Sequence, residues 1–298
     1  MARLASLKYA SSIISGYVQL LRPANVVTAF ADVLAGYALA GLSHPRGLPW
    51  LLLASGCLYA GGVVLNDYFD RDLDRIERPE RPIPSGRVRP GGAAALGVTL
   101  LAVGILSASR SNRAAALMAG AIAGCVALYD VRGKRHAAVA PLNMGLCRAL
   151  NLLLGVTAAP ALLWERSPVA LIPLTYIAAV TALSRGEVHG GQKGGATFAL
   201  VSLSAALSGL GWLVVRSSQA WMAGVVLLVL GWRVVPPFLS ARRTLEPGRI
   251  RSAVKRGVLS LVLVNAVIGT AYAGPVYGAM ILATGLVANA LARVFPVT

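Results

Sequence analysis

The chain contains few carboxylates, few charged residues of either sign and little cysteine. Its 298 residues include 11 Asp and Glu against 28 Lys and Arg, and 13% of all residues are charged. Because a soluble domain averages about 25% charged residues, the composition excludes an ordinary soluble domain. Cys57, Cys125 and Cys147 are odd in number and lie far apart in apolar segments. They indicate small core residues rather than a disulfide framework or a metal site.

Long apolar segments are abundant. The chain is 56% hydrophobic with a mean hydropathy of +0.68, and its apolar runs are continuous rather than alternating, which favours membrane-spanning helices over a β-barrel. We therefore predict an all-α, polytopic membrane bundle of about nine transmembrane helices in a single domain, 1–298, preceded over 1–23 by an interfacial amphipathic helix. The last two segments meet at Gly274-Pro275, so nine and ten spans both stay open. The segments are 24–42, 48–66, 92–109, 114–130, 141–162, 168–184, 196–215, 219–239, 256–273 and 275–293.

The basic residues are distributed unevenly across the expected loops. If the loops alternate between the two sides of the membrane, 22 of the 28 Lys and Arg lie on one side and five on the other, while Arg148 lies within a span. Such a bias marks the cytoplasmic side. We expect an integral protein of the cell inner membrane with its active site facing the cytoplasm. Topology accounts for the net charge of +17, so no nucleic-acid partner is expected.

Six of the eleven acidic residues fall within fourteen positions, directly after the second apolar segment. On a helix that continues past Leu65, Asp67, Asp70 and Asp74 lie within about 60° of one another, and Asn66 lies on an adjacent flank. Asp72 points to the far side. Grouped oxygen ligands suit Mg²⁺, and three carboxylates repel one another unless a cation is present. The alternative is a solvated helix end with arginine counter-ions. The six residues are Asp67, Asp70, Asp72, Asp74, Glu77 and Glu80.

The next segment, Arg75-Ile76-Glu77-Arg78-Pro79-Glu80-Arg81-Pro82-Ile83-Pro84-Ser85-Gly86-Arg87, contains three prolines. These prolines end the helix and turn the chain. We expect Arg78 and Arg81 to return over the carboxylates, where a guanidinium fits phosphate oxygens. An ordinary basic cytoplasmic loop is the competing interpretation.

This arrangement resembles the first aspartate-rich motif of the UbiA superfamily of intramembrane prenyltransferases. The likeness rests on Asn66-Asp67-x-x-Asp70-x-x-x-Asp74, Arg78-Pro79, Arg81-Pro82-x-Pro84-Ser85-Gly86 and the opening Arg22-Pro23-x-Asn25. The resemblance implies a bundle around a central cavity. It also implies Mg²⁺-dependent transfer of an isoprenyl group from an isoprenyl diphosphate to an aromatic or other small lipophilic acceptor, in contact with membrane lipids.

The same resemblance assigns roles to single residues. Mg²⁺ and the diphosphate would be held by Asn66, Asp67, Asp70 and Asp74, with Arg78 or Arg81 on the diphosphate oxygens. Tyr129 resembles the family's tyrosine at the inner end of the fourth span, and Arg132 or Lys134 would balance charge. An ordinary interfacial tyrosine with basic anchors is the alternative.

The second aspartate-rich motif is altered. The corresponding segment, Ser184-Arg185-Gly186-Glu187-Val188-His189-Gly190-Gly191-Gln192-Lys193, contains no aspartate. Glu187 is then the only carboxylate for a metal, with Arg185 or Lys193 taking diphosphate charge and His189 facing the site. Alternatively, the site has lost activity. The proton released on transfer has no obvious dedicated acceptor, and Asp74, Glu187 or the diphosphate would take it. The catalytic candidates are Asp67, Asp70, Asp74 and Glu187.

A narrower likeness, to the EboC branch of the superfamily, rests on Tyr129-Asp130-x-Arg132-Gly133-Lys134, Pro141-Leu142-Asn143-Met144-Gly145-Leu146-Cys147-Arg148 and the segment at Ser184. It favours a specialised acceptor over a quinone ring. The competing hypothesis for the whole chain is a catalytically silent protein that binds a prenyl lipid or diphosphate within a metabolite export or biosynthesis pathway.

Polar residues within the spans are further candidates for substrate binding. Arg148 and Asn151 share a helical face, with Asn143 about 80° from Asn151. An arginine in mid-span is costly and should face the cavity or a partner: the diphosphate, an acidic acceptor, Glu187 or backbone carbonyls. Asn25 and Asp32 are seven residues apart and share a face of the first span.

Overall fold

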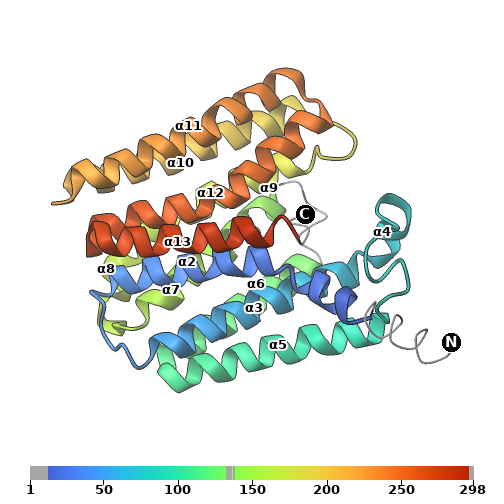
Figure 1. Ribbon diagram of the computed structural model, residues 1–298, viewed down its shortest axis with the longest axis horizontal. Coiled ribbons are helices and arrows are strands. Elements are labelled where there is room, and N and C mark those ends of the chain that lie inside the picture. The colour runs from blue at the N-terminus through green and yellow to red at the C-terminus, as the bar shows by residue number, and fades with distance from the viewer. Residues whose placement is uncertain (1–12, 132–135, 137, 295–298) are drawn as a thin grey trace.

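The computed structural model describes residues 13–131, 136 and 138–294, and within these ranges the regular structure is entirely helical (Figure 1). A short helix over 13–21 precedes the bundle. The α-helices are α2 (Pro23–Leu39), α3 (Leu48–Phe69), α4 (Arg71–Glu77), α5 (Pro90–Ser111), α6 (Arg113–Val131), α7 (Val139–Val156), α8 (Leu163–Arg166), α9 (Leu171–Ser184), α10 (Lys193–Arg216), α11 (Ala220–Thr244), α12 (Pro247–Ala273) and α13 (Pro275–Leu291). Two 3₁₀ turns, η2 (Pro160–Leu162) and η3 (Ser167–Ala170), flank α8.

Eight helical segments in the described ranges are long and apolar enough to cross a membrane. One of them, Pro160–Ser184, combines α9 with the short turns before it. The helices α2 and α13 contain 17 residues each, about 26 Å at 1.5 Å per residue, and both pack on the longer helices. The predicted all-α membrane bundle is confirmed.

Proline and glycine set the helix boundaries. Five α-helices have proline at their first or second residue, where the missing N–H has no partner to lose. At Gly274 the backbone adopts φ 88°, so α12 ends and α13 begins at Pro275. The sequence alone left open whether the last two segments are separate, and the structure has them as two helices, α12 and α13. The five helices are α2, α3, α5, α12 and α13.

Helix α2 lies at the centre of the bundle, between α13 and α7 in Figure 1, and it also contacts α12 and α3. Glycine makes the close approach to α7 possible. A Cβ at Gly36 would overlap the carbonyl oxygen of Leu152, and one at Gly155 would overlap the carbonyl oxygen of Val33. Small residues at such crossings let two helix backbones pack directly in a membrane.

A buried polar network fixes the same crossing. Asp32 is fully buried on α2, and its Oδ2 accepts hydrogen bonds from Nη1 of Arg148 at 2.9 Å and Nδ2 of Asn151 at 3.0 Å, both on α7. Its Oδ1 accepts from Nδ2 of Asn265 on α12 at 2.6 Å. Arg148 also donates to Thr28 Oγ1 at 3.1 Å. Through these hydrogen bonds, Asp32 connects α2 with α7 and α12 at one point.

The segment before α2 packs on the proline-rich loop. Leu20 is buried against Val64, Ile83 and Val88, and Nη1 of Arg87 donates to Oε1 of Gln19 at 2.8 Å. The helix over 13–21 therefore covers the loop after α4. Residues 1–12 of the predicted interfacial helix lie outside the described ranges.

Replacement of one partner of the Asp32–Arg148 pair should destabilise the protein. Arg148→Met leaves a buried carboxylate without its counter-ion, which costs about 3–5 kcal/mol, whereas Asp32→Leu combined with Arg148→Met removes both charges and costs less. Thermal unfolding in detergent measures the difference. Equal destabilisation by the single and double substitutions would contradict the assigned pairing.

Candidate active site

The carboxylate cluster lies at the junction of α3 and α4. Helix α3 ends at Phe69 and α4 begins at Arg71, so Asp70 occupies the break, with φ −89° and ψ 0°. The sequence interpretation assumed one continuous helix, and this assumption was wrong at Asp70. Asp72 does point outward: its side chain is 68% exposed and pairs with Arg75 at 2.8 Å. Asp67 and Asp74 are buried.

Two arginines compensate the buried carboxylates. Nη2 of Arg22 donates to Oδ1 of Asp67 at 2.6 Å. Nη1 of Arg81 lies 2.7 Å from Oδ2 of Asp74 and 3.3 Å from Oδ1 of Asp67. The proline-rich loop therefore places Arg81 over the carboxylates. The backbone of Arg22 is left-handed, with φ 45°, directly before α2, and its side chain reaches Asp67 from that position.

The electrostatics of the cluster favour a bound cation. Burial raises the pKa of Asp74, the Arg81 guanidinium lowers it, and the neighbouring Asp67 and Asp70 raise it, with a net increase. Burial is the main factor that disfavours the charged form of Asp74, and a nearby cation would stabilise that form. Arg22 and Arg81 supply only part of the positive charge that would balance Asp67, Asp70 and Asp74.

The second loop is connected to the first by two acid–base contacts. Glu187 is buried, and its Oε2 lies 3.8 Å from Nη2 of Arg78. Its Oε1 is buried without a hydrogen-bond partner, and burial raises the pKa of Glu187 although Arg78, Arg251 and Arg81 lower it. Nε2 of His189 lies 3.5 Å from Oε1 of Glu77. Arg78 thus joins the two predicted motifs.

Two of the remaining candidates on this loop, His189 and Arg185, line a different cavity. The His189 side chain is 83% exposed and contacts Glu77, so the expectation that it faces the metal site was wrong. It and Arg185 line a second cavity of about 550 Å³ at the inner ends of α9 and α10. Lys193 is exposed at the first residue of α10. The glycines of the loop allow this outward path, because Gly190 has φ 90°.

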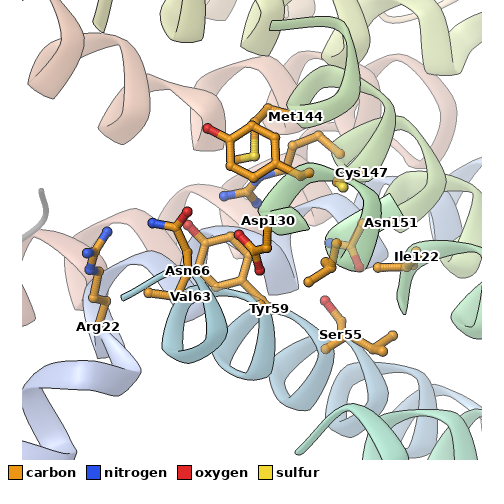
Figure 2. Close-up of a pocket in the computed structure, with 15 residues that line it drawn as sticks. Arg22, Ser55, Tyr59, Val63, Asn66, Ile122, Asp130, Met144, Cys147 and Asn151 are labelled. Atoms are coloured by element: carbon orange, nitrogen blue, oxygen red, sulfur yellow. The ribbon is translucent and has the colours of Figure 1, made fainter. Parts of the chain in front are cut away.

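A cavity of about 240 Å³ opens beside the cluster, between α3, α6 and α7. Figure 2 shows Arg22 and Asn66 toward one end, Ser55, Ile122 and Asn151 toward the other, and Tyr59 and Asp130 between them. The walls are mostly apolar, so the cavity suits a hydrocarbon chain whose charged end remains at the carboxylates. The lining residues from α6 and α7 include Val126, Tyr129, Met144, Cys147 and Arg148.

The inner end of α6 contributes Tyr129 and Asp130 to this cavity. Asp130 is 3% exposed, and sequence analysis did not select it. Its position directly after Tyr129 in a chain with so few acids was the available signal. Arg132 and Lys134, expected to balance charge here, lie outside the described residues.

Arg148 lines the cavity but has a partner that the sequence did not predict. The guanidinium pairs with Asp32 rather than Glu187 and lies over the ring of Tyr59, 4.6 Å from its centroid. The proposed pairing with Glu187 was wrong, because Glu187 is held by Arg78 on another loop. Asn25 is buried on α2, and Asn143 is buried on α7, where Cys147 Sγ donates to its Oδ1 at 3.7 Å.

The described residues fit a hard divalent cation by their chemistry. Asn66, Asp67, Asp70 and Asp74 offer oxygen atoms at one helix junction, and Glu187 offers an unpaired buried oxygen. In the described part of the chain, no three His, Cys, Asp or Glu side chains converge on one metal position. The physical reason is that the arginines draw Asp67, Asp74 and Glu187 toward themselves. A bound cation would compete with the arginines for the carboxylates, and a bound diphosphate would compete with the carboxylates for the arginines.

Comparison with known proteins agrees with this architecture. A sequence model of the UbiA prenyltransferase family matches residues 28–185. The chain belongs to the UbiA prenyltransferase family. The match extends from α2 to the first residue of the second loop, so it includes the carboxylate cluster and the residues that line the cavity apart from Arg22.

Curated relatives in the UbiA family are named digeranylgeranylglyceryl phosphate synthases. The protein from Sulfurisphaera tokodaii is 30% identical over 223 residues, 73% of this chain and 76% of the relative. Those from Natronomonas pharaonis and Methanopyrus kandleri are 42% and 33% identical, but the matches span 34% and 55% of the relatives' lengths.

Solved structures of UbiA homologues have the same fold. A homologue from Aeropyrum pernix K1 superposes with a TM-score of 0.69 at 16% identity, over 88% of this chain and 98% of that one. A homologue from Archaeoglobus fulgidus, bound to GPP and Mg²⁺, gives 0.60 at 14% identity, over 92% and 99%.

We expect the UbiA-type carboxylates to bind a divalent cation together with diphosphate. With inorganic diphosphate present, Asp67→Asn and Asp74→Asn should each weaken Mn²⁺ affinity at least about tenfold, because each removes a charged oxygen ligand. Electron paramagnetic resonance of free Mn²⁺ measures this. Asp72→Asn is the matched control, and a similar loss in that variant would contradict the site.

Proposed function

We propose that this protein is a Mg²⁺-dependent intramembrane prenyltransferase, formed by one domain over 1–298, that moves an isoprenyl group from its diphosphate to a small lipophilic acceptor. The observation that carries the proposal is the Asp67–Asp74 cluster, bridged by Arg81 and contacted at Asp67 by Arg22, at the mouth of an apolar cavity. Charged groups for a diphosphate and apolar walls for its hydrocarbon tail therefore meet at one place.

The binding step follows from the charges. Asn66, Asp67, Asp70 and Asp74 would hold Mg²⁺, which supplies Lewis-acid stabilisation of the leaving diphosphate when bound. Arg22 and Arg81 lie on the same carboxylates. They exchange these partners for diphosphate oxygens, to which guanidinium groups donate in a forked geometry. Arg78 and Glu187 contribute from the rim.

The chemical step needs charge stabilisation in a dry site. As the allylic C–O bond breaks, the arginines stabilise the negative charge that develops on the diphosphate. The apolar walls contributed by Leu58, Val63, Ile122 and Val126 exclude water from the allylic cation. Tyr129, in the same wall, is available as a hydrogen-bond donor. The positive-inside charge bias favours a cytoplasmic position for this mouth, in the cell inner membrane.

The names of the curated relatives favour a particular acceptor class. Digeranylgeranylglyceryl phosphate carries a glyceryl phosphate, and the synthases of this name are 28–42% identical to this chain over the matched segments. We therefore favour an acceptor with a glyceryl phosphate or similar phosphorylated alcohol over an aromatic ring. The Archaeoglobus fulgidus homologue bound to GPP and Mg²⁺ supports the donor class. Membership of the EboC-like branch stays a prediction.

One observation favours a second function, that of a silent binder of prenyl diphosphates. The second loop has a single buried carboxylate, Glu187, and Arg78 is already beside it. A site with fewer negatively charged ligands would bind less cationic charge. It would therefore stabilise the leaving diphosphate less. The intact first cluster favours the enzyme.

The deciding experiment is Mg²⁺-dependent diphosphate release by the protein in lipid nanodiscs with a panel of isoprenyl diphosphates and glyceryl phosphate acceptors. Asp70→Asn should lower the rate by about two orders of magnitude, since metal-assisted leaving-group stabilisation is worth several kcal/mol. Asp72→Asn should retain the wild-type rate. Binding of the diphosphate without release in the wild type would establish the silent binder instead.

A further inference from the structure

The proposed reaction leaves a proton to be removed. An acceptor hydroxyl that attacks the allylic carbon keeps its O–H proton until a base takes it. Within the described residues, the carboxylates at the mouth are poorly suited to this role. Asp67 and Asp74 are bonded to Arg22 and Arg81, and Glu187 lies beside Arg78 on another loop. Their charge serves the metal and the arginines.

Asp130 occupies a different position. It is the one carboxylate among the residues that line the 240 Å³ cavity. The residue is 3% exposed and belongs to the last turn of α6. In the view of Figure 2, the Asp130 side chain lies between the Asn66 end and the Asn151 end of the cavity.

A carboxylate on this wall faces the space that the reacting carbon would enter. With the diphosphate at Asn66 and Asp67, the first carbon of the isoprenyl chain lies just inside the mouth, and the acceptor hydroxyl must approach it within the cavity. A carboxylate in such an apolar wall is costly, so its presence marks a functional position. It also attracts the positive charge that develops on the allylic carbon.

We propose that Asp130 is the proton acceptor of the transfer reaction, an inference that rests on the proposed prenyltransferase function. The allylic C–O bond breaks and its electron pair leaves with the diphosphate. A lone pair of the acceptor hydroxyl forms the new C–O bond, the electron pair of the O–H bond stays on that oxygen, and the proton moves to a carboxylate oxygen of Asp130. The carboxylic acid then returns its proton to the departing diphosphate or to water.

The test separates bond cleavage from capture. The donor is geranylgeranyl diphosphate with Mg²⁺, the acceptor is a geranylgeranylglyceryl phosphate, and both diphosphate and prenylated product are quantified for the protein in nanodiscs. In the wild type, the two should form in equal amounts. In Asp130→Asn, diphosphate should still be released, while product per diphosphate falls at least tenfold and free prenyl alcohol replaces it.

Two variants control this result. Asp130→Glu retains a carboxylate and should restore more of the product yield than Asp130→Asn does. Asp70→Asn should show the opposite pattern, with little diphosphate release of any kind. Absence of release in the wild type would contradict the proposed function itself. Equal loss of release and product in Asp130→Asn, with an unchanged unfolding midpoint, would overturn the proton-acceptor role and assign Asp130 to diphosphate or metal binding.

A thiol acceptor gives an independent readout. If the attacking hydroxyl is replaced by a thiol, much of the nucleophile is ionised without a base at pH 9, because a free thiol has a pKa of about 8.5. With the thiol acceptor, Asp130→Asn should form nearly as much product per diphosphate released as the wild type does. A product yield equally low with the thiol and the hydroxyl acceptor would show that Asp130 positions the acceptor instead.

Discussion

The contact of Arg81 with both Asp67 and Asp74 is the interaction on which the rest of the mouth depends. Two carboxylates at the end of a membrane span repel each other, and burial makes that repulsion stronger. Arg81 relieves it only because the proline-rich loop turns back over the break between α3 and α4. The loop in turn is held by Leu20 and Gln19 of the preceding helix. This charge pairing thus connects the proline-rich loop to the end of α3 and to α4, and the helix over 13–21 packs on the same loop.

A second charge pair, Asp32 and Arg148, lies where α2 crosses α7, and its two charges neutralise each other. Asp32 satisfies Arg148 so completely, with Asn151 and Asn265 on the same carboxylate, that little of either charge remains for a ligand. The cavity therefore has an ionic mouth that can exchange partners and an inner wall whose charges are already neutralised. The first region would attract an anionic group such as the proposed diphosphate, whereas the second suits an apolar chain.

The helices and the first cluster could be predicted from the sequence because both depend on local patterns. Apolar runs of span length determine the helices, and the spacing of Asp67, Asp70, Asp72 and Asp74 separated the outward residue from the others. Contacts between distant residues could not be predicted in this way. Asp32 meets Arg148 across 116 positions, and Arg22 meets Asp67 across 45. His189 was misplaced because a glycine-rich loop has no periodicity that fixes its direction, and the break at Asp70 depends on tertiary packing.

The altered second motif is best understood through these same pairings. A loop rich in aspartate would add negative charge opposite Asp67 and Asp74 and would need a second cation to offset it. In this chain, Glu187 faces Arg78 and His189 faces Glu77, so protein side chains hold the two loops together. The cavity of about 240 Å³ is smaller than the ~300–1,000 Å³ typical of pockets that enclose a whole ligand. A cavity of this size would enclose only part of a long prenyl chain in the proposed donor, and Asp130, Tyr129 and Arg22 line its wall.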